Sequence, residues 1–372
     1  MMKNRNNGDF PQIFENSIIR SDMEDIFSRK IPWNEFENCT VLITGAYGML
    51  ASYIAYFFVW LNEEMDKNIT LIAAVRNREK AQKVFGNILD KKYFRLYLED
   101  INEKFEFSER IDYIFHAAGI ANPKLYSLYP TEVAKTNVIA TYNLLNWALD
   151  HPIKGFLMFS SGDVYGRMIN QNIIYEEDMG ITDPLDIHSC YGESKRMSET
   201  WCMTYAKEYN VHAVAARICH TYGPLMDLEN DPRVFASFVK NALEKTDIEI
   251  LSDGTACRPF CYITDAVAAF LLLILRGKSG EAYNVSNSTE FISVKQLAFV
   301  ISSLTSEESK VIIKGTRNDG YLESKNNHEN CPVEDKLEKL GWKHIVNVEE
   351  GFRRVLMYHE KEKALSDSNQ CS

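Results

Sequence analysis

The sequence lacks any hydrophobic run long enough to cross a bilayer. Its longest apolar stretches, 51–61 and 266–275, fall short of the about 20 residues that a membrane-spanning helix needs. The first ten residues, MMKNRNNGDF, also lack the apolar core of a secretory signal. We therefore expect no membrane partner.

Paired cysteines and excess basic charge are also absent. The 8 cysteines include no C-x-x-C pair, so we expect isolated thiols in a reducing, cytoplasmic compartment. A net charge of −11 argues against a nucleic-acid partner, which would require a basic surface. With 372 residues, 45% hydrophobic and 25% charged, the chain has the composition of a soluble globular protein with a large core.

The stretch 39–51, CTVLITGAYGMLA, predicts a β-strand, a tight glycine turn and a helix. Gly45 suits a turn residue with positive φ. Gly48 would let backbone approach a pyrophosphate at the helix N-terminus, where unpaired N–H groups favour anions. Ala51 stands at the third small position of a dinucleotide fingerprint. An ordinary strand–turn–helix unit is the alternative.

Apolar strands then alternate with helices over some 180 residues. This pattern predicts an α/β fold, a Rossmann doubly wound parallel sheet with sites at the carboxyl ends of its strands. The expected strands are 40–43, 70–75, 94–98, 111–119, 155–160 and 211–218, and the expected helices include 49–62, one ending near 149, and one from 191 to about 209.

Four regions are expected along the chain. Residues 1–38 form an N-terminal helical extension, with a capping box at Ser21–Glu24 that opens a helix ending before Pro32. Residues 39–222 form the dinucleotide-binding domain. Residues 223–360 form mainly a smaller C-terminal α/β substrate lobe, with helices at 234–243 and 266–275, interleaved with the first domain. Residues 361–372 form a polar, frayed tail.

The end of the second strand bears on cofactor choice. An acidic residue there would bind the adenosine ribose hydroxyls, but the sequence has Arg76. A guanidinium could bind a 2′-phosphate or stack on adenine. An exposed loop charge explains Arg76 equally well, so NAD and NADP both remain open.

Tyr191 and Lys195 are four residues apart and share one helix face. A lysine ammonium would lower the pKa of the phenol, as would a positive nicotinamide ring. The phenolate could then take a proton from a sugar hydroxyl while hydride leaves the same carbon. An exposed helix pair is the alternative, but the preceding glycine turn and the serine at a strand end favour the catalytic interpretation.

Taken together, these motifs resemble the extended short-chain dehydrogenase/reductase family, in particular its nucleotide-sugar epimerases, dehydratases and decarboxylases. The resemblance covers roughly residues 39–355. It rests on TGAYGMLA, HAAG, TNVIATYNLL, SSGDVYG, YGESK, ARICHTYGP and RPFCYITDAVAA. It implies a bound NAD or NADP, a nucleoside diphosphate-sugar substrate, and a homodimer formed by the helices that contain Asn137 and Tyr191. It also implies that Asn137 fixes the lysine through water.

The resemblance and the strand ends together give the expected site. The catalytic residues are Ser161, Asp163, Tyr191 and Lys195. The cofactor residues are Gly45, Tyr47, Gly48, Met49, Arg76, Asp100, Ile101, Ala117, Ala118, Gly119, Asn137, Tyr191 and Lys195. The substrate residues are Ser161, Gly162, His220, Arg233 and Arg258. No metal ion is expected.

Asp163 distinguishes the possible reactions. If residues 161–163 are extended, Ser161 and Asp163 point to the same side. A carboxylate there could remove a C5 proton after C4 is oxidised, as a decarboxylase- or dehydratase-like step requires. If Asp163 only caps a turn, a 4-epimerase or 4-keto reductase is the alternative. Glutamate is usual in place of Asp163, and Gly162 and Leu225 also depart from the family pattern. A sensor that binds a dinucleotide without turnover is a third possibility.

Overall fold

The computed structural model describes residues 10–169, 171–305, 309–315 and 330–370. Its centre is a seven-stranded sheet in the order β12-β7-β5-β4-β1-β2-β3, and each neighbouring pair is parallel. The chain turns from one half of the sheet to the other between β1 and β4, where doubly wound folds bind ligands. The strands are β1 Thr40–Thr44, β2 Thr70–Ala74, β3 Phe94–Tyr97, β4 Tyr113–His116, β5 Gly155–Ser161, β7 Ala213–Ile218 and β12 Ala282–Val285.

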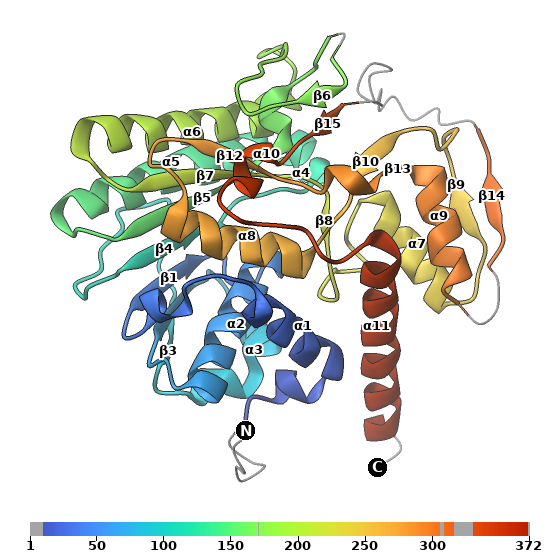
Figure 1. Ribbon diagram of the computed structural model, residues 1–372, viewed down its shortest axis with the longest axis horizontal. Coiled ribbons are helices and arrows are strands. Elements are labelled where there is room, and N and C mark those ends of the chain that lie inside the picture. Colours follow the sequence, from blue (N-terminus) through green and yellow to red (C-terminus); the bar gives the residue numbers. More distant parts are fainter. Residues whose placement is uncertain (1–9, 170, 306–308, 316–329, 371–372) are drawn as a thin grey trace.

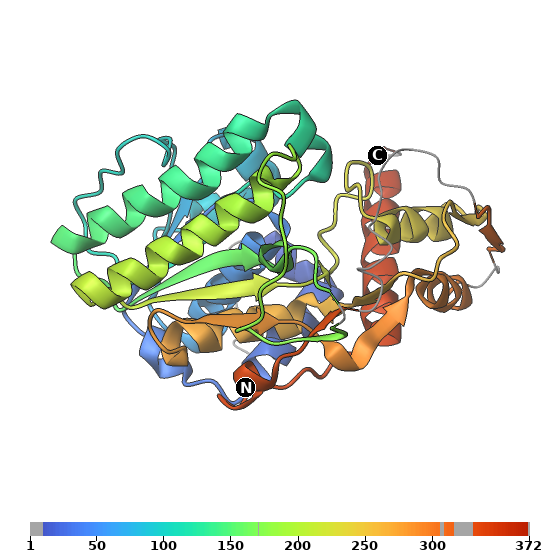
Figure 2. The ribbon, with the colours of Figure 1, turned by 90° about the horizontal axis from the view of Figure 1, so that it is seen from above.

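Helices cover both faces of this sheet. α5 and α6 lie side by side over one face (Figure 2), and α2 and α8 cover the other (Figure 1). α2 and α8 are buried on nearly every side, because α1 packs against both of them. Their uniformly apolar sequences therefore reflect burial in a core. The helices of this part are α1 Ser17–Ser28, α2 Met49–Met65, α3 Arg78–Phe85, α4 Pro123–Leu128, α5 Pro130–Asp150, α6 Ser189–Tyr209 and α8 Ile263–Arg276.

The predicted fold class is confirmed. The observed strands match the expected ones closely, although β4 is shorter than 111–119 and β7 begins at Ala213. The smaller lobe is built from short pieces, and β12, which follows much of it in the chain, returns to the edge of the main sheet. Its elements are β8 Thr221–Tyr222, α7 Val234–Leu243, β9 Ile248–Ile250, β10 Cys257–Pro259, β11 Cys261–Tyr262, β13 Phe291–Ser293, α9 Val294–Ser303 and β14 Val311–Ile313.

The two ends of the chain differ from the sequence expectations. α1 begins after Asn16, whose side chain accepts a hydrogen bond from the Ile18 N–H, so the capping box at Ser21 is wrong and Ser21 lies inside the helix. The expected frayed tail is also wrong up to Gln370, because α11, Val348–Gln370, continues through it. Of the expected extension, residues 1–9 lie outside the described part. Three short elements complete the chain: β6 Ile173–Ile174, β15 Cys331–Pro332 and α10 Asp335–Glu338.

A buried polar cluster joins the N-terminal extension to the rest of the molecule. The Asp22 carboxylate on α1 accepts hydrogen bonds from the hydroxyls of Tyr53 on α2 and Tyr262 on β11, each at 2.7 Å. Arg354 on α11 donates to the same carboxylate at 2.9 Å. Burial raises the pKa of Asp22 to about 6 against the opposing effect of these partners. One carboxylate thus ties four elements together.

Within the described residues, no helix combines the length and the apolar character needed to span a membrane. The seven cysteines in that part of the chain are all free thiols.

Candidate active site

The glycine turn joins β1 to α2 at the carboxyl edge of the sheet. Gly45 has a φ of +63°, and a Cβ there would lie 2.9 Å from the Ala118 Cα, so both conformation and space require glycine. Gly48 precedes α2, and no side chain caps that helix. The N-terminal N–H groups of α2 are therefore available to an anion such as a pyrophosphate.

The pair Tyr191 and Lys195 lies on the first two turns of α6, and both side chains are buried. The Lys195 ammonium donates to the Phe159 carbonyl at 2.7 Å and lies 5.8 Å from the centre of the Tyr191 ring. Burial lowers the pKa of Lys195 to about 8. Lys195 is therefore held beside the phenol without a direct hydrogen bond to it.

The expected lowering of the Tyr191 pKa is not found in the protein alone. Burial raises the pKa of this phenol, the nearby Asp163 charge raises it further, and a hydrogen bond with the Ser161 side chain lowers it. A neutral phenol is favoured because a phenolate at this site would be desolvated and would face a carboxylate. Any activation must come from a positive charge added beside the ring.

The segment after β5 is not extended, so the condition under which Ser161 and Asp163 would point to the same side is not met. Ser161 ends the strand, and residues Gly162–Tyr165 form a 3₁₀ turn in which the Ser161 hydroxyl accepts a hydrogen bond from the Asp163 N–H. Asp163 nevertheless lies near Tyr191 and the start of α6. It lies close enough to Tyr191 to affect its pKa, and a Cβ at Gly192 would come 3.0 Å from the Asp163 carbonyl oxygen. The glycine after Tyr191 therefore lets α6 approach this turn.

Solvent reaches the Asp163 side chain, but the surrounding protein atoms still desolvate its carboxyl. This desolvation raises the pKa of Asp163, and the nearby Arg258 guanidinium opposes the rise. A carboxylate with a raised pKa is better matched to proton abstraction near neutral pH than an ordinary surface aspartate.

Asn137 lies on α5 with 1% of its surface exposed. Its amide nitrogen donates to the Ser194 hydroxyl at 2.9 Å, whereas its Oδ1 is buried without a partner. A Cβ on Gly119 would lie 2.6 Å from this oxygen and 3.1 Å from the Lys195 ammonium. The unsatisfied acceptor and the cation thus border the same small space, which suits a bridging water.

Three predicted substrate residues lie near one another but differ in character. Burial, together with the charges of Arg258 and Arg233, lowers the pKa of His220 to about 3, so that His220 is neutral. Arg233 is held by the Asp231 carboxylate and by the Thr221 carbonyl, which leaves it less suited to bind phosphate. The Arg258 guanidinium is close enough to Asp163 to lower the pKa of its carboxyl, and Arg258 is the stronger candidate to bind a substrate anion.

The remaining cofactor candidates lie on loops that follow strands. Arg76 is exposed just after β2, and Asn77 caps α3. Asp100 accepts a hydrogen bond from the Asn102 N–H, which fixes the loop after β3, and Ile101 is buried. Tyr47, Met49 and Ala117 are half-buried beside the glycine turn.

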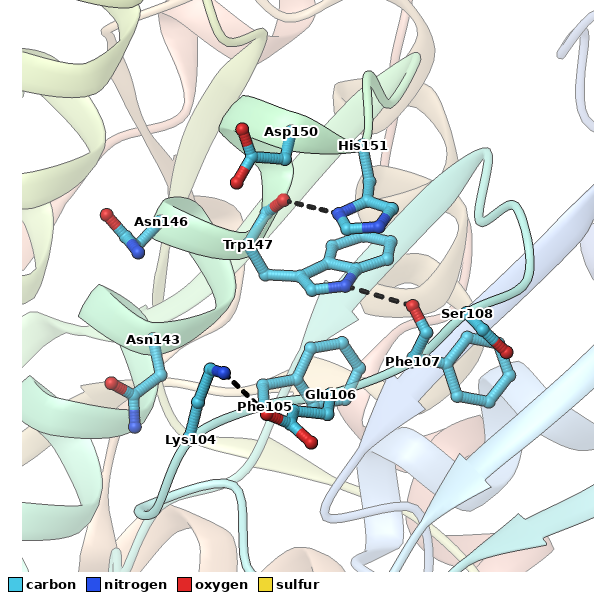
Figure 3. A pocket seen from close by; sticks show the side chains of 10 residues that line it. All are labelled: Lys104, Phe105, Glu106, Phe107, Ser108, Asn143, Asn146, Trp147, Asp150 and His151. Carbon is cyan, nitrogen blue, oxygen red and sulfur yellow. Dashed lines mark hydrogen bonds and ion pairs between the residues drawn. The ribbon is translucent and has the colours of Figure 1, made fainter.

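Two surface cavities lie away from this site. The first, of about 550 Å³, is lined by the loop 104–108 and the end of α5, where Trp147 stacks on His151 and its indole donates to the Phe107 carbonyl (Figure 3). The second, of about 560 Å³, includes the ion pair of Arg217 with Glu199. Neither contains a predicted site residue.

The described residues contain one group of side chains spaced to hold a metal ion, namely Glu334, Glu338 and His344. Glu334 already accepts hydrogen bonds from the Ser288 N–H and hydroxyl. None of the three belongs to the predicted catalytic set.

Two buried features of the site were missed in the sequence. Tyr126 on α4 stacks on Tyr191, with ring centres 4.9 Å apart and planes at 11°. Thr44 and His116 form hydrogen bonds beneath the glycine turn. The sequence could have indicated His116, because it is a polar residue at the end of an apolar strand. It could not have indicated Tyr126, because the contact with Tyr191 joins residues 65 positions apart.

These features define a dinucleotide-dependent enzyme of the extended short-chain dehydrogenase type. Residues 41–286 match the model of the NAD dependent epimerase/dehydratase family, and the chain belongs to that family. The resemblance found in the sequence is confirmed, and so is the nicotinamide cofactor. The unsatisfied Asn137 Oδ1, the uncapped α2 N-terminus and the Gly45 turn fit such a cofactor.

The chain is similar to particular relatives and solved structures. UDP-glucuronic acid decarboxylase 6 from Arabidopsis thaliana is 29% identical over 319 residues, which cover 85% of this chain and 87% of that protein. The fold is similar to UDP-glucose 4-epimerase from Thermotoga maritima, with a TM-score of 0.74, 23% identity, and coverage of 87% and 99%. It is also similar to dTDP-glucose 4,6-dehydratase from Bacillus anthracis, solved in complex with NAD, with a TM-score of 0.69, 19% identity, and coverage of 88% and 98%.

Proposed function

We propose that the protein oxidises the sugar of a nucleoside diphosphate-sugar at C4 and then acts at C5 or C6, as a decarboxylase or dehydratase does. The observation that carries this proposal is the Asp163 carboxyl, which has a raised pKa and lies beside Tyr191 and near Arg258. The similarity to a UDP-glucuronic acid decarboxylase supports it.

In the first step Tyr191 accepts the proton of the C4 hydroxyl. A nicotinamide dinucleotide held at the Gly45 turn and the N-terminus of α2 would take the C4 hydride. The oxidised nicotinamide supplies a hydride acceptor and a positive charge. Ser161 holds the phenol through their hydrogen bond. Lys195, held by the Phe159 carbonyl, adds a cation close to the ring, and Asn137 fixes Lys195 through water. Positive charge beside the phenol opposes the effects that raise its pKa.

The second step uses the C4 ketone. A ketone stabilises negative charge at C5, so either a C5 proton or a C6 carboxylate can then be lost. Asp163 is the base for the proton. Arg258 binds an anionic group of the substrate, either its diphosphate or a sugar carboxylate, because a guanidinium forms paired hydrogen bonds with such groups. His220 is a neutral donor nearby, and Gly162 lies in the turn between Ser161 and Asp163.

The second candidate is a 4-epimerase with the same first step, or a 4-keto reductase that carries out this hydride and proton transfer at C4 in reverse. It is favoured by the 3₁₀ turn after β5, because residues 161–163 are not extended and the backbone does not turn the Ser161 and Asp163 side chains to the same side as a strand would. The UDP-glucose 4-epimerase from Thermotoga maritima has a similar fold.

Asp163→Asn distinguishes these functions. If Asp163 is the C5 base, the variant oxidises C4 and then stops, so bound cofactor accumulates in its reduced form with near-ultraviolet absorbance. The assay uses UDP-, dTDP-, GDP- and CDP-sugars as substrates and identifies the products by mass spectrometry. Loss of CO₂ indicates decarboxylation, loss of water dehydration, gain of two hydrogens reduction, and an unchanged mass epimerisation. Normal turnover by the variant with loss of CO₂ would show that decarboxylation needs no base at Asp163. Normal turnover without loss of CO₂ or water would leave the epimerase or reductase standing.

We further infer a cytoplasmic homodimer. The described cysteines are free, which fits a reducing compartment. Large apolar side chains are exposed on the adjacent helices α5 and α6, including Ile139, Tyr142 and Met203. Two copies of this helix pair could cover one another, as the family resemblance implies.

A further inference from the structure

A continuous chain of buried hydrogen bonds runs from the glycine turn to α5. Thr44 ends β1, His116 ends β4 and Thr141 lies on α5, and all three are buried. Thr44 Oγ1 lies 2.8 Å from His116 Nδ1, and His116 Nε2 lies 3.0 Å from Thr141 Oγ1. The imidazole ring therefore bridges the turn and the helix.

The neighbours of the ring determine where its proton lies. The Thr141 hydroxyl donates to the Asn137 carbonyl at 2.6 Å, so toward His116 it can only accept, and Nε2 must carry the hydrogen. Nδ1 of a neutral ring is then an acceptor for the Thr44 hydroxyl. The Thr44 oxygen in turn accepts from the Ala118 N–H at 3.0 Å. This arrangement satisfies every group in the chain.

The ring also stays neutral. Burial and the Lys195 charge lower the pKa of His116 to about 3. A second ring N–H would face Thr44, whose hydroxyl already donates toward the ring, and would break the chain. His116 is thus a fixed connector with one donor end and one acceptor end.

We propose that His116 is a positioning residue that couples the dinucleotide-binding turn to Asn137. At one end the chain holds Ala118, against which the turn glycine packs, and at the other it holds the backbone of Asn137. The proposal rests on dinucleotide binding and not on the sugar reaction. It is therefore tested with the cofactor alone.

The test is a cycle of Thr44→Val, Thr141→Val and the double variant, with dissociation constants for NAD and NADH measured by fluorescence titration. Thr141→Val acts from the far side of His116, yet it should weaken cofactor binding by about two- to tenfold, the effect of one lost hydrogen bond. The double variant should bind the cofactor as tightly as the single variant with the lower affinity, because either change breaks the same chain of hydrogen bonds.

The control is Thr200→Val on α6, since Thr200 makes the same bond to the carbonyl four residues earlier, outside the chain. It should bind cofactor as the wild type does. The proposal would be overturned if Thr141→Val left the dissociation constants unchanged. It would also be overturned if the fold-changes in dissociation constant of the two single variants multiplied in the double variant. If the variants unfold, ¹⁵N NMR spectra of the His116 ring in the wild-type protein test the proposal instead. They should show a neutral ring that is protonated at Nε2 and unprotonated at Nδ1 from pH 5 to 8. An imidazolium, or a ring protonated at Nδ1, would overturn the proposal.

Discussion

At the scale of single residues, the site depends on groups whose protonation is set by burial. Tyr191 and Asp163 have raised pKa values, whereas the pKa values of Lys195 and His220 are lowered. In each case the protein disfavours the charged form. A substrate and a cofactor that bring opposite charges would therefore change the protonation of these groups most.

Tyr191→Phe tests the phenol. The ring of phenylalanine can still stack on Tyr126, so the site should keep its shape and its affinity for the dinucleotide. Hydride transfer should fall by about 10²–10⁴-fold, the usual contribution of a positioned acid or base. Stopped-flow absorbance of the reduced cofactor measures it. Turnover at the wild-type rate would show that another group takes the proton.

At the scale of elements, the strand ends decide what the sheet can bind. The turn after β1 is fixed by glycine and by its contact with Ala118. The turn after β2 carries Arg76 in place of an acid, with α3 beginning directly behind it. We propose that these two neighbouring strand ends present backbone N–H groups and the Arg76 guanidinium to one ligand.

Arg76→Asp tests the cofactor preference set by that second turn. Arg76 should let NADP(H) bind at least as well as NAD(H), because a guanidinium can pair with the 2′-phosphate. The variant should favour NAD(H), since an aspartate repels the phosphate and accepts the ribose hydroxyls. Isothermal titration of both cofactors gives the ratio. A ratio that does not change would make Arg76 a loop charge only.

At the scale of the whole molecule, buried charge joins the N-terminal extension, the main sheet domain and the smaller lobe. Asp22 is fully buried and is paired with Arg354 on α11. Arg354→Leu should lower the free energy of unfolding by about 3 kcal/mol at pH 7, because it leaves a buried carboxylate unpaired. The neighbouring Arg353, whose side chain is more exposed and is paired with Glu349 and Glu350, is the control, and Arg353→Leu should lower the free energy of unfolding by less than about 1 kcal/mol.

The difference in free energy of unfolding between the wild type and Arg354→Leu should depend on pH through Asp22. Its pKa is raised to about 6 in the folded protein, so the folded state binds the proton more tightly than the unfolded state. The stability due to protonation is present below about pH 4 and is lost as the pH rises through 6. Without the Arg354 charge the pKa of Asp22 is raised further, so more stability is lost as the pH rises. The difference in free energy of unfolding between wild type and variant, measured in urea titrations, should therefore widen over this range. A gap that is constant from pH 4 to 7 would contradict the assignment.

Assembly is tested by Ile139→Glu on the outer face of α5. Ile139 is 39% exposed, so a glutamate should be tolerated in an isolated chain but should prevent a paired apolar surface from forming. Sedimentation should show a dimer for the wild type and a monomer for the variant, with equal thermal stability at low concentration. A monomeric wild type would rule out the dimer.

The sequence by itself determined the parallel sheet, the glycine turn and the placement of Tyr191 and Lys195 on one helix face. These depend on local periodicity and on spacings within a few residues, which the chain carries wherever it folds. It also indicated the family, because the motifs at successive strand ends occur in a fixed order.

Only the tertiary structure decided the state of the site. The raised pKa of Tyr191, its stacking on Tyr126 and the hydrogen bonds of His116 join residues that are distant in the chain. The sequence left the conformation at Asp163 open and misplaced the start of α1 for a related reason, since several residues could cap or extend each segment and packing selected one. Desolvation depends on what surrounds a group in three dimensions, and no local pattern specifies that.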